Sequence, residues 1–483
     1  MSSPVPVSVE SEPLTVGDLT AQKLSSSVPL PTDSSVITGP IRRTLFFLAM
    51  PVLAEQVLNT MVGLVDVYLA GRISASATAA VGLSAYVSWF VSLIVMLIAT
   101  GTTAVVARLE GAGDHAEANH FANQSLTLAA ILGMIVCPLM YMLAPWFTAY
   151  CRLTGDAETI AVTYLRTEAF GHVAFSMTLV GCAAFRGVGN MRTPMVIFAA
   201  INVVNVVTSC GLVYGWGPLP EVGVNGIVGG TVIARYLGAI LTVILLVGGK
   251  YGLRLHAREL SLSLDRAARV LRIGIPAAAD GAVMWMGQFV FIAIISRLAP
   301  PPMGEAYFAA HIIAVRTEAL TYLPAVAWAA ATATMIGQAL GAGDSRRAIR
   351  VGHEGVMQCG LLSLGIAVFF FFGASLIYQQ MSTDEAVRAA GTDPFRVLAL
   401  LQPCMVVSIV YIGGLRGAGD TRYPLLITLV GAILIRVPLG YYFGVVCRGG
   451  LFGAWIGMFG DMIWRAVGAT IRYHQAQWIK TRL

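Results

Sequence analysis

The stretch RGVGNMRTP at residues 186–194 returns as RGAGDTRYP at residues 416–424, a separation of 230 residues. A shorter stretch, GAGD at residues 111–114, returns at residues 341–344 with the same separation. Self-similarity at one spacing indicates that a chain contains two copies of one structural unit. The two halves of this chain are therefore expected to share one fold.

Single residues extend the match toward the start of each half. Pro51 corresponds to Pro276 and Arg72 to Arg297, in both cases 225 residues apart. Apolar stretches long enough to cross the hydrocarbon core of a membrane recur along both halves. They begin near Leu45, Ala79, Phe121, Ala161, Thr193 and Val224, and again near Ile273, Ala306, Gly355, Phe395, Tyr423 and Gly449.

This pattern predicts an all-α polytopic membrane protein with twelve transmembrane helices in two six-helix lobes. Because each half has an even number of spans, both halves enter the membrane from the same side. Such parallel repeats are related by an axis along the membrane normal, and a cavity is expected between the lobes.

The composition agrees with a membrane protein. Hydrophobic residues make up 57% of the 483 residues and charged residues only 12%, against roughly 25% charged residues in soluble domains. The seven cysteines show no CxxC pair or metal-ligand spacing, so we interpret them as packing residues. The net charge of +6 comes from scattered clusters rather than one basic stripe, which argues against a nucleic-acid partner.

The basic clusters predict the orientation. Most of them fall between helices on one side, including the segment 250–272 that joins the halves. By the positive-inside rule both termini are cytoplasmic, in a multi-pass protein of the inner (plasma) membrane. Residues 1–40 are polar and proline-containing, without a signal-peptide pattern, and predict a disordered cytoplasmic tail. We expect an N-lobe at 41–249, a basic linker at 250–272 and a C-lobe at 273–483.

The two glycine-containing motifs can be interpreted in two ways. Glycine-rich turns at helix starts can bind phosphate, but no strand precedes either motif, so we favour tight cytoplasmic turns. Glycine permits positive φ, and the arginines are expected to anchor the turns at the lipid headgroups. Pro194 and Pro424 begin the next helix, where a missing N–H costs nothing.

Ionisable side chains inside the membrane are costly and therefore informative. Glu55 and Asp66 in the first helix are eleven residues apart, about three turns, so they share nearly one face, which Asn59 continues. This face must point into the protein. The two acids either pair with partners to fix helix packing or take part in transport, and we favour the second role for Asp66.

Polar residues also occur in the fifth and sixth helices. Asn202, Asn205 and Ser209 lie in the fifth helix and Thr231 in the sixth. Taken singly, such residues usually bond helices together. A carboxylate such as Asp66 combined with amide and hydroxyl oxygens can instead hold a hard cation such as sodium, and the same carboxylate can bind a proton.

The second half differs from the first in its charges. Asp280 corresponds to Glu55, but the position corresponding to Asp66 is Phe291. In the twelfth helix Asp461 and Arg465 are four residues apart, which predicts an ion pair within the helix.

Helix seven supplies the candidates for an apolar substrate cavity. Met284, Trp285, Gln288 and Phe289 could line it together with Asn59 of helix one. Packing in the core or against lipid is an equally good explanation for any one of the four.

From about Ile41 to its end the chain resembles the multidrug and toxic compound extrusion (MATE) transporters. The resemblance rests on PVLAEQVLNTMVGLVDVYLAG from Pro51, on both glycine motifs, and on NVVTSCGLVYG from Asn205. It implies six-plus-six helices around a V-shaped cavity. It also implies export of a drug, organic cation or metabolite by antiport with sodium or protons.

Some site residues carry over from the family. Asp66 falls on the helix-one aspartate whose ion or proton binding is thought to rearrange the N-lobe, and Asn205 and Thr231 match an asparagine and a threonine of helices five and six. Ser209 stands where DinF-like members have a second aspartate. The C-lobe carboxylates of NorM-like members have no counterpart in this resemblance, since their positions fall at Met284 or Trp285 and near Met405. The resemblance thus places coupling in an N-lobe site closer to DinF-like members.

We therefore expect a monomeric antiporter that exports small organic, cationic or amphipathic molecules in exchange for sodium or protons, without a cofactor. Its partners would be the small-molecule substrate and membrane lipids. The alternative within transport is a lipid or lipid-linked-sugar flippase, whose cavity should carry several basic residues. No HExxH motif, paired Cys/His or nucleophile elbow supports an enzyme, and unequal duplicated halves argue against a channel.

Overall fold

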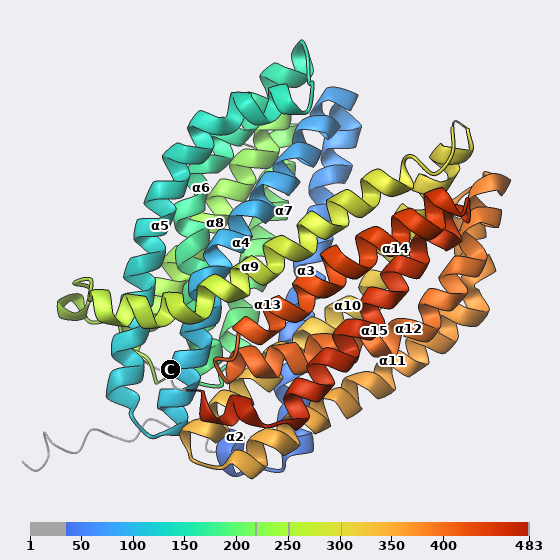
Figure 1. Ribbon diagram of the computed structural model, residues 1–483. Coiled ribbons are helices and arrows are strands. Elements are labelled where there is room, and N and C mark those ends of the chain that lie inside the picture. The colour runs from blue at the N-terminus through green and yellow to red at the C-terminus, as the bar shows by residue number, and fades with distance from the viewer. Residues whose placement is uncertain (1–34, 218–219, 250–251, 301, 482–483) are drawn as a thin grey trace, which may run out of the picture.

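The computed structural model describes residues 35–217, 220–249, 252–300 and 302–481, and over these residues the chain forms helices and turns without strands (Figure 1). The N-lobe contains α3 (Ile41–Ile73), α4 (Ala75–Gly111), α5 (His115–Tyr150), α6 (Asp156–Gly187), α7 (Arg192–Tyr214) and α8 (Val224–Gly248). The C-lobe contains α9 (Leu264–Ile295), α10 (Met303–Gly341), α11 (Ser345–Met381), α12 (Glu385–Gly417), a composite helix and α15 (Gly450–His474). The composite helix consists of α13 (Arg422–Thr428), η2 (Leu429–Arg436), α14 (Val437–Tyr441) and η3 (Tyr442–Val446).

The twelve predicted transmembrane helices are present. Eleven helical segments in the described part of the chain are long and apolar enough to cross a membrane. The twelfth, α15, carries the buried Asp461 and Arg465 in its middle. Many large apolar side chains on the outer faces are exposed, for example Met142 on α5 and Phe372 on α11, as expected for a surface in contact with lipid.

Two predicted segments differ from the structure. Helix α9 already begins at Leu264, so the second part of the predicted linker is helical. The part before it contains the short helix η1 (Ala257–Glu259) and is held on α5, where the Gln124 side chain donates to the Glu259 carbonyl at 2.7 Å. Of the predicted tail, residues 1–34 lie outside the described residues, but α2 (Ser35–Thr38) is an ordered turn of helix with Val36 buried.

The GAGD motifs are tight turns, as predicted. Gly113 and Gly343 have φ of 77° and 76°, in the left-handed region where glycine is favoured. Asp114 and Asp344 then cap the N-termini of α5 and α11 by accepting from backbone N–H groups of the first turn.

The first glycine of each GAGD motif has another role, which is close contact between the lobes. A Cβ atom on Gly111 would lie 2.0 Å from the carbonyl oxygen of Gln338, and one on Gly341 would lie 2.0 Å from that of Arg108. Residues 111 and 341 are equivalent in the repeat, as are 108 and 338. The pseudo-two-fold axis of the duplicated chain therefore passes between α4 and α10, where the two backbones touch.

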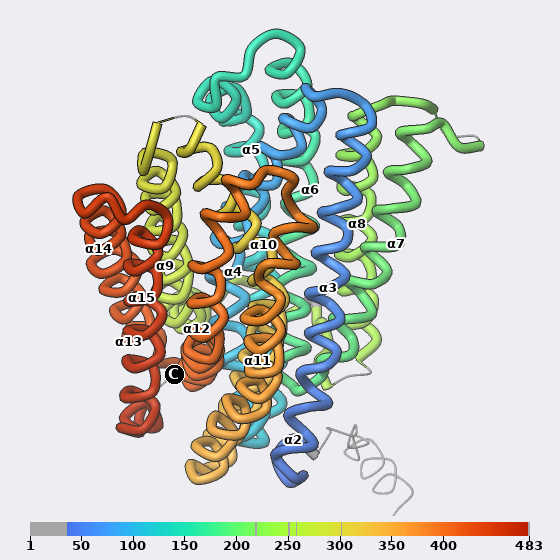
Figure 2. The backbone as a smooth tube through the Cα atoms, turned by 90° about the vertical axis from the view of Figure 1, so that its right-hand side faces the viewer, coloured from blue at the N-terminus to red at the C-terminus, as the bar shows by residue number. Residues whose placement is uncertain are grey.

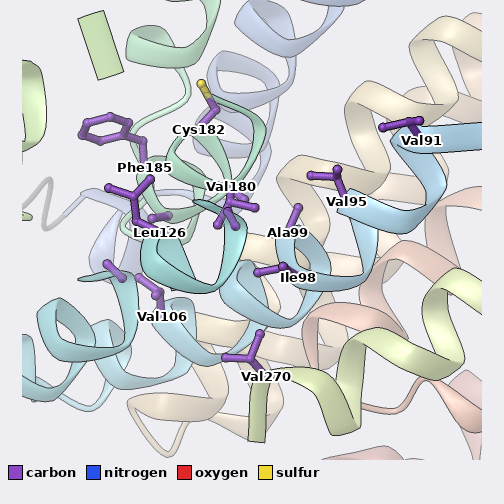
Figure 3. Packing of buried hydrophobic residues seen from close by; sticks show 14 of the residues in the cluster. Val91, Val95, Ile98, Ala99, Val106, Leu126, Val180, Cys182, Phe185 and Val270 are labelled. Carbon is purple, nitrogen blue, oxygen red and sulfur yellow. The ribbon is translucent and has the colours of Figure 1, made fainter. Parts of the chain in front are cut away.

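The first helix of each lobe crosses from one lobe to the other. In α3, Leu45 packs in a cluster formed mainly by the C-lobe, whereas Leu69 packs in the N-lobe. In α9, Val270 packs with Ile98 of the N-lobe, as Figure 3 shows, whereas Ile295 packs in the C-lobe. Figure 2 shows α3 between the N-lobe helices and α10 and α11. Helices α3 and α9 therefore connect the interior of their own lobe to the interface between the two lobes.

The first arginine of the repeated RGxG motif forms a buried ion pair. Arg186 Nη2 lies 2.5 Å from Glu55 Oε1, and Arg416 donates in the same way to Asp280. The prediction that these arginines anchor the turns at the headgroups is therefore wrong for Arg186 and Arg416, because each has an acidic partner on the first helix of its own half.

Candidate functional site

A cavity of about 320 Å³ lies inside the N-lobe, between α3, α4, α6, α7 and α8. It is lined by Asn59, Val62, Gly63, Asp66, Ser88, Phe175, Thr178, Phe198, Ile201, Asn202, Asn205, Thr231, Ala234 and Arg235. Among these lining residues Asp66 and Arg235 are the two charged ones. The cavity is mostly apolar with a few convergent polar groups, which is typical of small-ligand sites.

Helix periodicity explains which residues reach the cavity. From α3 come positions 59, 62, 63 and 66, and from α7 positions 198, 201, 202 and 205. Both sets follow the spacing i, i+3, i+4, i+7, which marks one face of a helix. The stripe predicted on the first helix is therefore present from Asn59 to Asp66.

Two hydrogen bonds fix the polar groups of α7. Asn202 Nδ2 donates to Asn59 Oδ1 at 3.4 Å, which joins α7 to α3. Asn205 Nδ2 donates to Thr231 Oγ1 at 3.0 Å, and this hydroxyl donates to the Ile227 carbonyl at 3.1 Å. Because the Asn205 nitrogen is bonded to Thr231, the oxygen of the same amide points away from Thr231 and is available to another partner.

Two buried oxygen atoms of the cavity lining are left without a hydrogen-bond donor among the described residues. They are Asp66 Oδ1 and Asn205 Oδ1. A buried acceptor without a partner costs about 1–3 kcal/mol. The cavity therefore has free acceptors, one of them on a carboxylate, that a cation or a proton can satisfy.

The sequence analysis did not predict the ion pair between Glu168 and Arg235, of which Arg235 lines the cavity. Glu168 of α6 is buried and accepts hydrogen bonds from the hydroxyls of Ser84 and Ser88. Arg235 of α8 donates to Glu168 Oε1 at 2.9 Å. Both residues interrupt apolar helices, so the cost of ionisable groups in a membrane, applied to the fourth and sixth transmembrane helices (α6 and α8) as it was to α3, would have found them.

The remaining predicted coupling residues lie nearby but outside the cavity lining. Ser209 is fully buried and donates to the Ile227 carbonyl at 3.3 Å, so it joins α7 to α8. Glu55 precedes the cavity-lining residues of α3 by about one turn and is paired with Arg186. Both have the helix-packing contacts that were the alternative to a role in transport.

The four predicted substrate-cavity residues of α9 lie in the other lobe and do not line this cavity. Trp285 contacts Trp89 of α4, with ring centroids 3.9 Å apart, and Phe289 lies near Tyr86 at 6.4 Å. They therefore form an aromatic contact between α9 and α4. Met284 is half-buried on the same helix.

The C-lobe buries a group of charged residues around Asp461. Asp461 accepts from Arg436 and, at 2.9 Å, from Arg465, which confirms the predicted ion pair within the helix. Arg436 also donates to Gln288 at 2.8 Å and lies over the ring of Phe291 at 5.9 Å. The position equivalent to Asp66 is thus occupied by Phe291, whose ring lies against a paired arginine. The two lobes are therefore chemically unequal.

Comparison with known proteins agrees with this architecture. The chain is 29% identical over 441 residues to the probable multidrug resistance protein NorM of Thermotoga maritima, covering 91% of this chain and 94% of that protein. It is 28% identical over 413 residues to the multidrug resistance protein PmpM of Pseudomonas aeruginosa, covering 83% and 84%.

Solved structures share the fold. A MATE protein in the bent conformation superposes with a TM-score of 0.85 at 21% identity, covering 92% of this chain and 98% of that one. An outward-facing multidrug resistance MATE transporter superposes with a TM-score of 0.84 at the same identity and coverage. The MatE family model matches residues 51–210 and 276–442, one segment in each half. Because these segments cover more than half of the sequence, the chain belongs to the MatE family of membrane transporters.

Proposed function

We propose that the chain is an antiporter that exports small organic, cationic or amphipathic molecules in exchange for sodium or protons. Asp66 is the coupling carboxylate, and Asn205 and Thr231 are its neighbours. The relatives named as multidrug resistance proteins support the substrate class. The single observation that carries the site is the pair of free buried acceptors, Asp66 Oδ1 and Asn205 Oδ1, in one cavity.

The chemistry of this pair suits either ion. Sodium prefers oxygen ligands, and a carboxylate with an amide oxygen supplies two of them, with the Thr231 hydroxyl beside them. A proton would neutralise Asp66 alone. Either ion removes the uncompensated negative charge from the membrane interior, which stabilises the N-lobe in its loaded form.

Coupling follows from the position of Asp66 on α3. One part of this helix packs in the N-lobe around the cavity and the other packs on the C-lobe. Ion uptake at Asp66 changes the relative stability of the two lobe arrangements by the difference in ion affinity between them. The arrangement that releases substrate outward is favoured with the ion bound, and ion release inward restores the arrangement that takes up substrate.

The flippase alternative is not favoured. A phosphate headgroup requires several basic groups, and among the lining residues the cavity has one arginine, already bonded to Glu168.

The test is efflux of ethidium from cells that express wild type or Asp66→Asn, with the sodium and proton gradients collapsed separately. We expect efflux to stop when one of the two gradients is removed and to be lost in Asp66→Asn. Asp114→Asn is the matched control, because asparagine caps a helix about as well as aspartate. Normal pumping by Asp66→Asn would refute the site, and no efflux by wild type under either gradient would refute the function.

A further inference from the structure

Arg235 has one half of its guanidinium group bonded and the other half free. Its Nη2 donates to Glu168 at 2.9 Å and to the Ser88 hydroxyl at 3.1 Å. Its Nη1 is buried and has no hydrogen-bond acceptor among the described residues. A buried donor without a partner is as costly as a buried acceptor without one.

The free donor of Arg235 and the free acceptor of Asp66 belong to the same cavity. Arg235 and Asp66 are both lining residues, and each has a buried, unpaired polar atom. The cavity has a volume of about 320 Å³. Pairing of the two groups requires a change of rotamer of the long arginine side chain.

The charges of this region do not balance. Asp66 and Glu168 carry two negative charges, and Arg235 carries one positive charge. One arginine can neutralise either carboxylate, so the other needs a cation from outside. The C-lobe network shows the opposite case, because Asp461 has two arginine partners.

Glu168 keeps two hydrogen-bond donors when the arginine turns toward Asp66. The hydroxyls of Ser84 and Ser88 both donate to its carboxylate, one to each oxygen, and would remain there. The guanidinium carbon also lies 5.2 Å from the centre of the Phe175 ring, a cation–π contact that favours Arg235 at the cavity wall.

We propose that Arg235 is a tethered cation that competes with the coupling ion for Asp66. When the ion leaves, the free Nη1 pairs with the Asp66 carboxylate, so that Asp66 and Glu168 share one guanidinium group. When an ion returns, it displaces Arg235, which stays bonded to Glu168. This inference rests on the proposed function of Asp66, and it explains how the ion-free protein can cross to its other arrangement without leaving the Asp66 carboxylate unpaired in the membrane.

The test measures the coupling-ion concentration for half-maximal ethidium transport in proteoliposomes, with sodium and pH varied separately. In Glu168→Gln the arginine loses its first partner and should occupy Asp66, so this concentration should rise at least tenfold. In the double variant Glu168→Gln with Arg235→Gln the competitor is gone, so it should fall to the wild-type value or below. Removing a second residue thus restores ion binding that the first substitution impaired.

A purely structural pair predicts another result. The double variant would then be no better than Glu168→Gln, and equal values for these two variants would overturn the proposal. Asp280→Asn with Arg416→Gln neutralises another buried acid–arginine pair, which lies in the C-lobe, and should leave the ion dependence unchanged. A thermal melt of each reconstituted protein separates loss of folding from loss of ion binding.

Failure of the proposed function gives a different pattern in the same assay. If Asp66→Asn transports with an unchanged ion dependence, the coupling site itself is wrong. If Asp66→Asn removes the ion dependence while Glu168→Gln keeps the wild-type value, only the role of Arg235 is wrong.

Discussion

In the proposed ion site, Thr231 fixes the rotation of the Asn205 amide. Its hydroxyl accepts from Asn205 Nδ2, so the amide oxygen is presented as a free acceptor in the same cavity as Asp66. Without this hydroxyl the amide could turn, and its N–H₂ group would then oppose a cation. In the proposed site, this threonine would thus decide whether the asparagine attracts or repels a cation.

We therefore expect Thr231→Val to weaken coupling-ion binding about fivefold, which corresponds to one net hydrogen bond of about 1 kcal/mol. The ion dependence of ethidium transport in proteoliposomes measures this change. Ser209→Ala is the control, because its hydroxyl bonds the same Ile227 carbonyl but does not line the cavity. An equal shift in both variants would mean that the α7 and α8 contact matters, and not the direction of the amide.

Sequence reasoning identified polar residues of α3, α7 and α8 that line the N-lobe cavity, but not Glu168 or Arg235. Asp66 and Asn205 stand out because they interrupt apolar helices at helical spacing. The Glu168 and Arg235 pair lies on two helices that are distant in the sequence, 67 residues apart, and only packing brings them together. The free atoms that carry the proposals depend on three-dimensional hydrogen bonding and could not be predicted.

At the scale of the helices, the repeated ion pairs fasten the first helix of each half to the turn motif of that half. Glu55 and Arg186 join α3 to the end of α6, and Asp280 and Arg416 join α9 to the end of α12. This explains why an acid in the first helix and an arginine in the RGxG motif both recur in the duplicated sequence. Glu55 therefore serves to position α3, the helix that carries Asp66.

Breaking one such buried pair leaves a charge without a partner and typically costs about 3–5 kcal/mol. We expect Glu55→Gln to lower the thermal stability of the purified protein clearly. The double variant Glu55→Gln with Arg186→Gln should recover most of the loss, because no buried charge is left. Thermal melts in detergent provide the comparison.

Asp265→Asn is a control for removing an ion pair at an exposed position, where no measurable change is expected. If Glu55→Gln melted like wild type, the pair would not fasten α3. The recurrence of an acid and an arginine at these positions in both halves would then need another explanation.

The helix number and the turns followed from hydropathy and glycine spacing, but the helix ends did not. Helix α9 extends beyond the bilayer length, and nothing in the polar composition of residues 264–272 distinguishes an amphipathic helical extension from a loop. Charged residues suit both, and the contacts that decide between them come from the N-lobe, against which Val270 is packed.

At the scale of the whole molecule, the lobes meet closely on the side of the GAGD turns. Gln338 Nε2 donates to the Gly187 carbonyl at 2.9 Å, and Thr334 donates to the Arg186 carbonyl at 3.0 Å, both from α10 to the N-lobe. The absence of a Cβ atom at Gly111 and Gly341 permits these contacts. The structure is thus an arrangement in which this side is closed.

A side chain at this contact should force the lobes apart. In Gly341→Val the new Cβ would lie 2.0 Å from the Arg108 carbonyl oxygen, so the α4 and α10 backbones must separate. We expect a longer distance between spin labels at positions 116 and 346, measured by double electron–electron resonance, and a lower ion-driven transport rate.

Gly360→Val is the control, because this α11 glycine has open space around its Cβ position. The same label distances in Gly341→Val and wild type would contradict a close contact at the repeat axis.

That the first helices cross between the lobes was also not predictable, since residues such as Leu45 and Leu69 are equally apolar and only the fold assigns them to different cores.

The most direct test of the central claim is the release of the coupling ion when substrate binds to the purified protein. Ethidium is added to protein loaded with radioactive sodium, and in a second experiment to protein in weakly buffered solution with a pH indicator. The account predicts that wild type and Asp114→Asn release one of the two ions and that Asp66→Asn releases neither. Equal release by Asp66→Asn and wild type would show that the ion does not bind at Asp66.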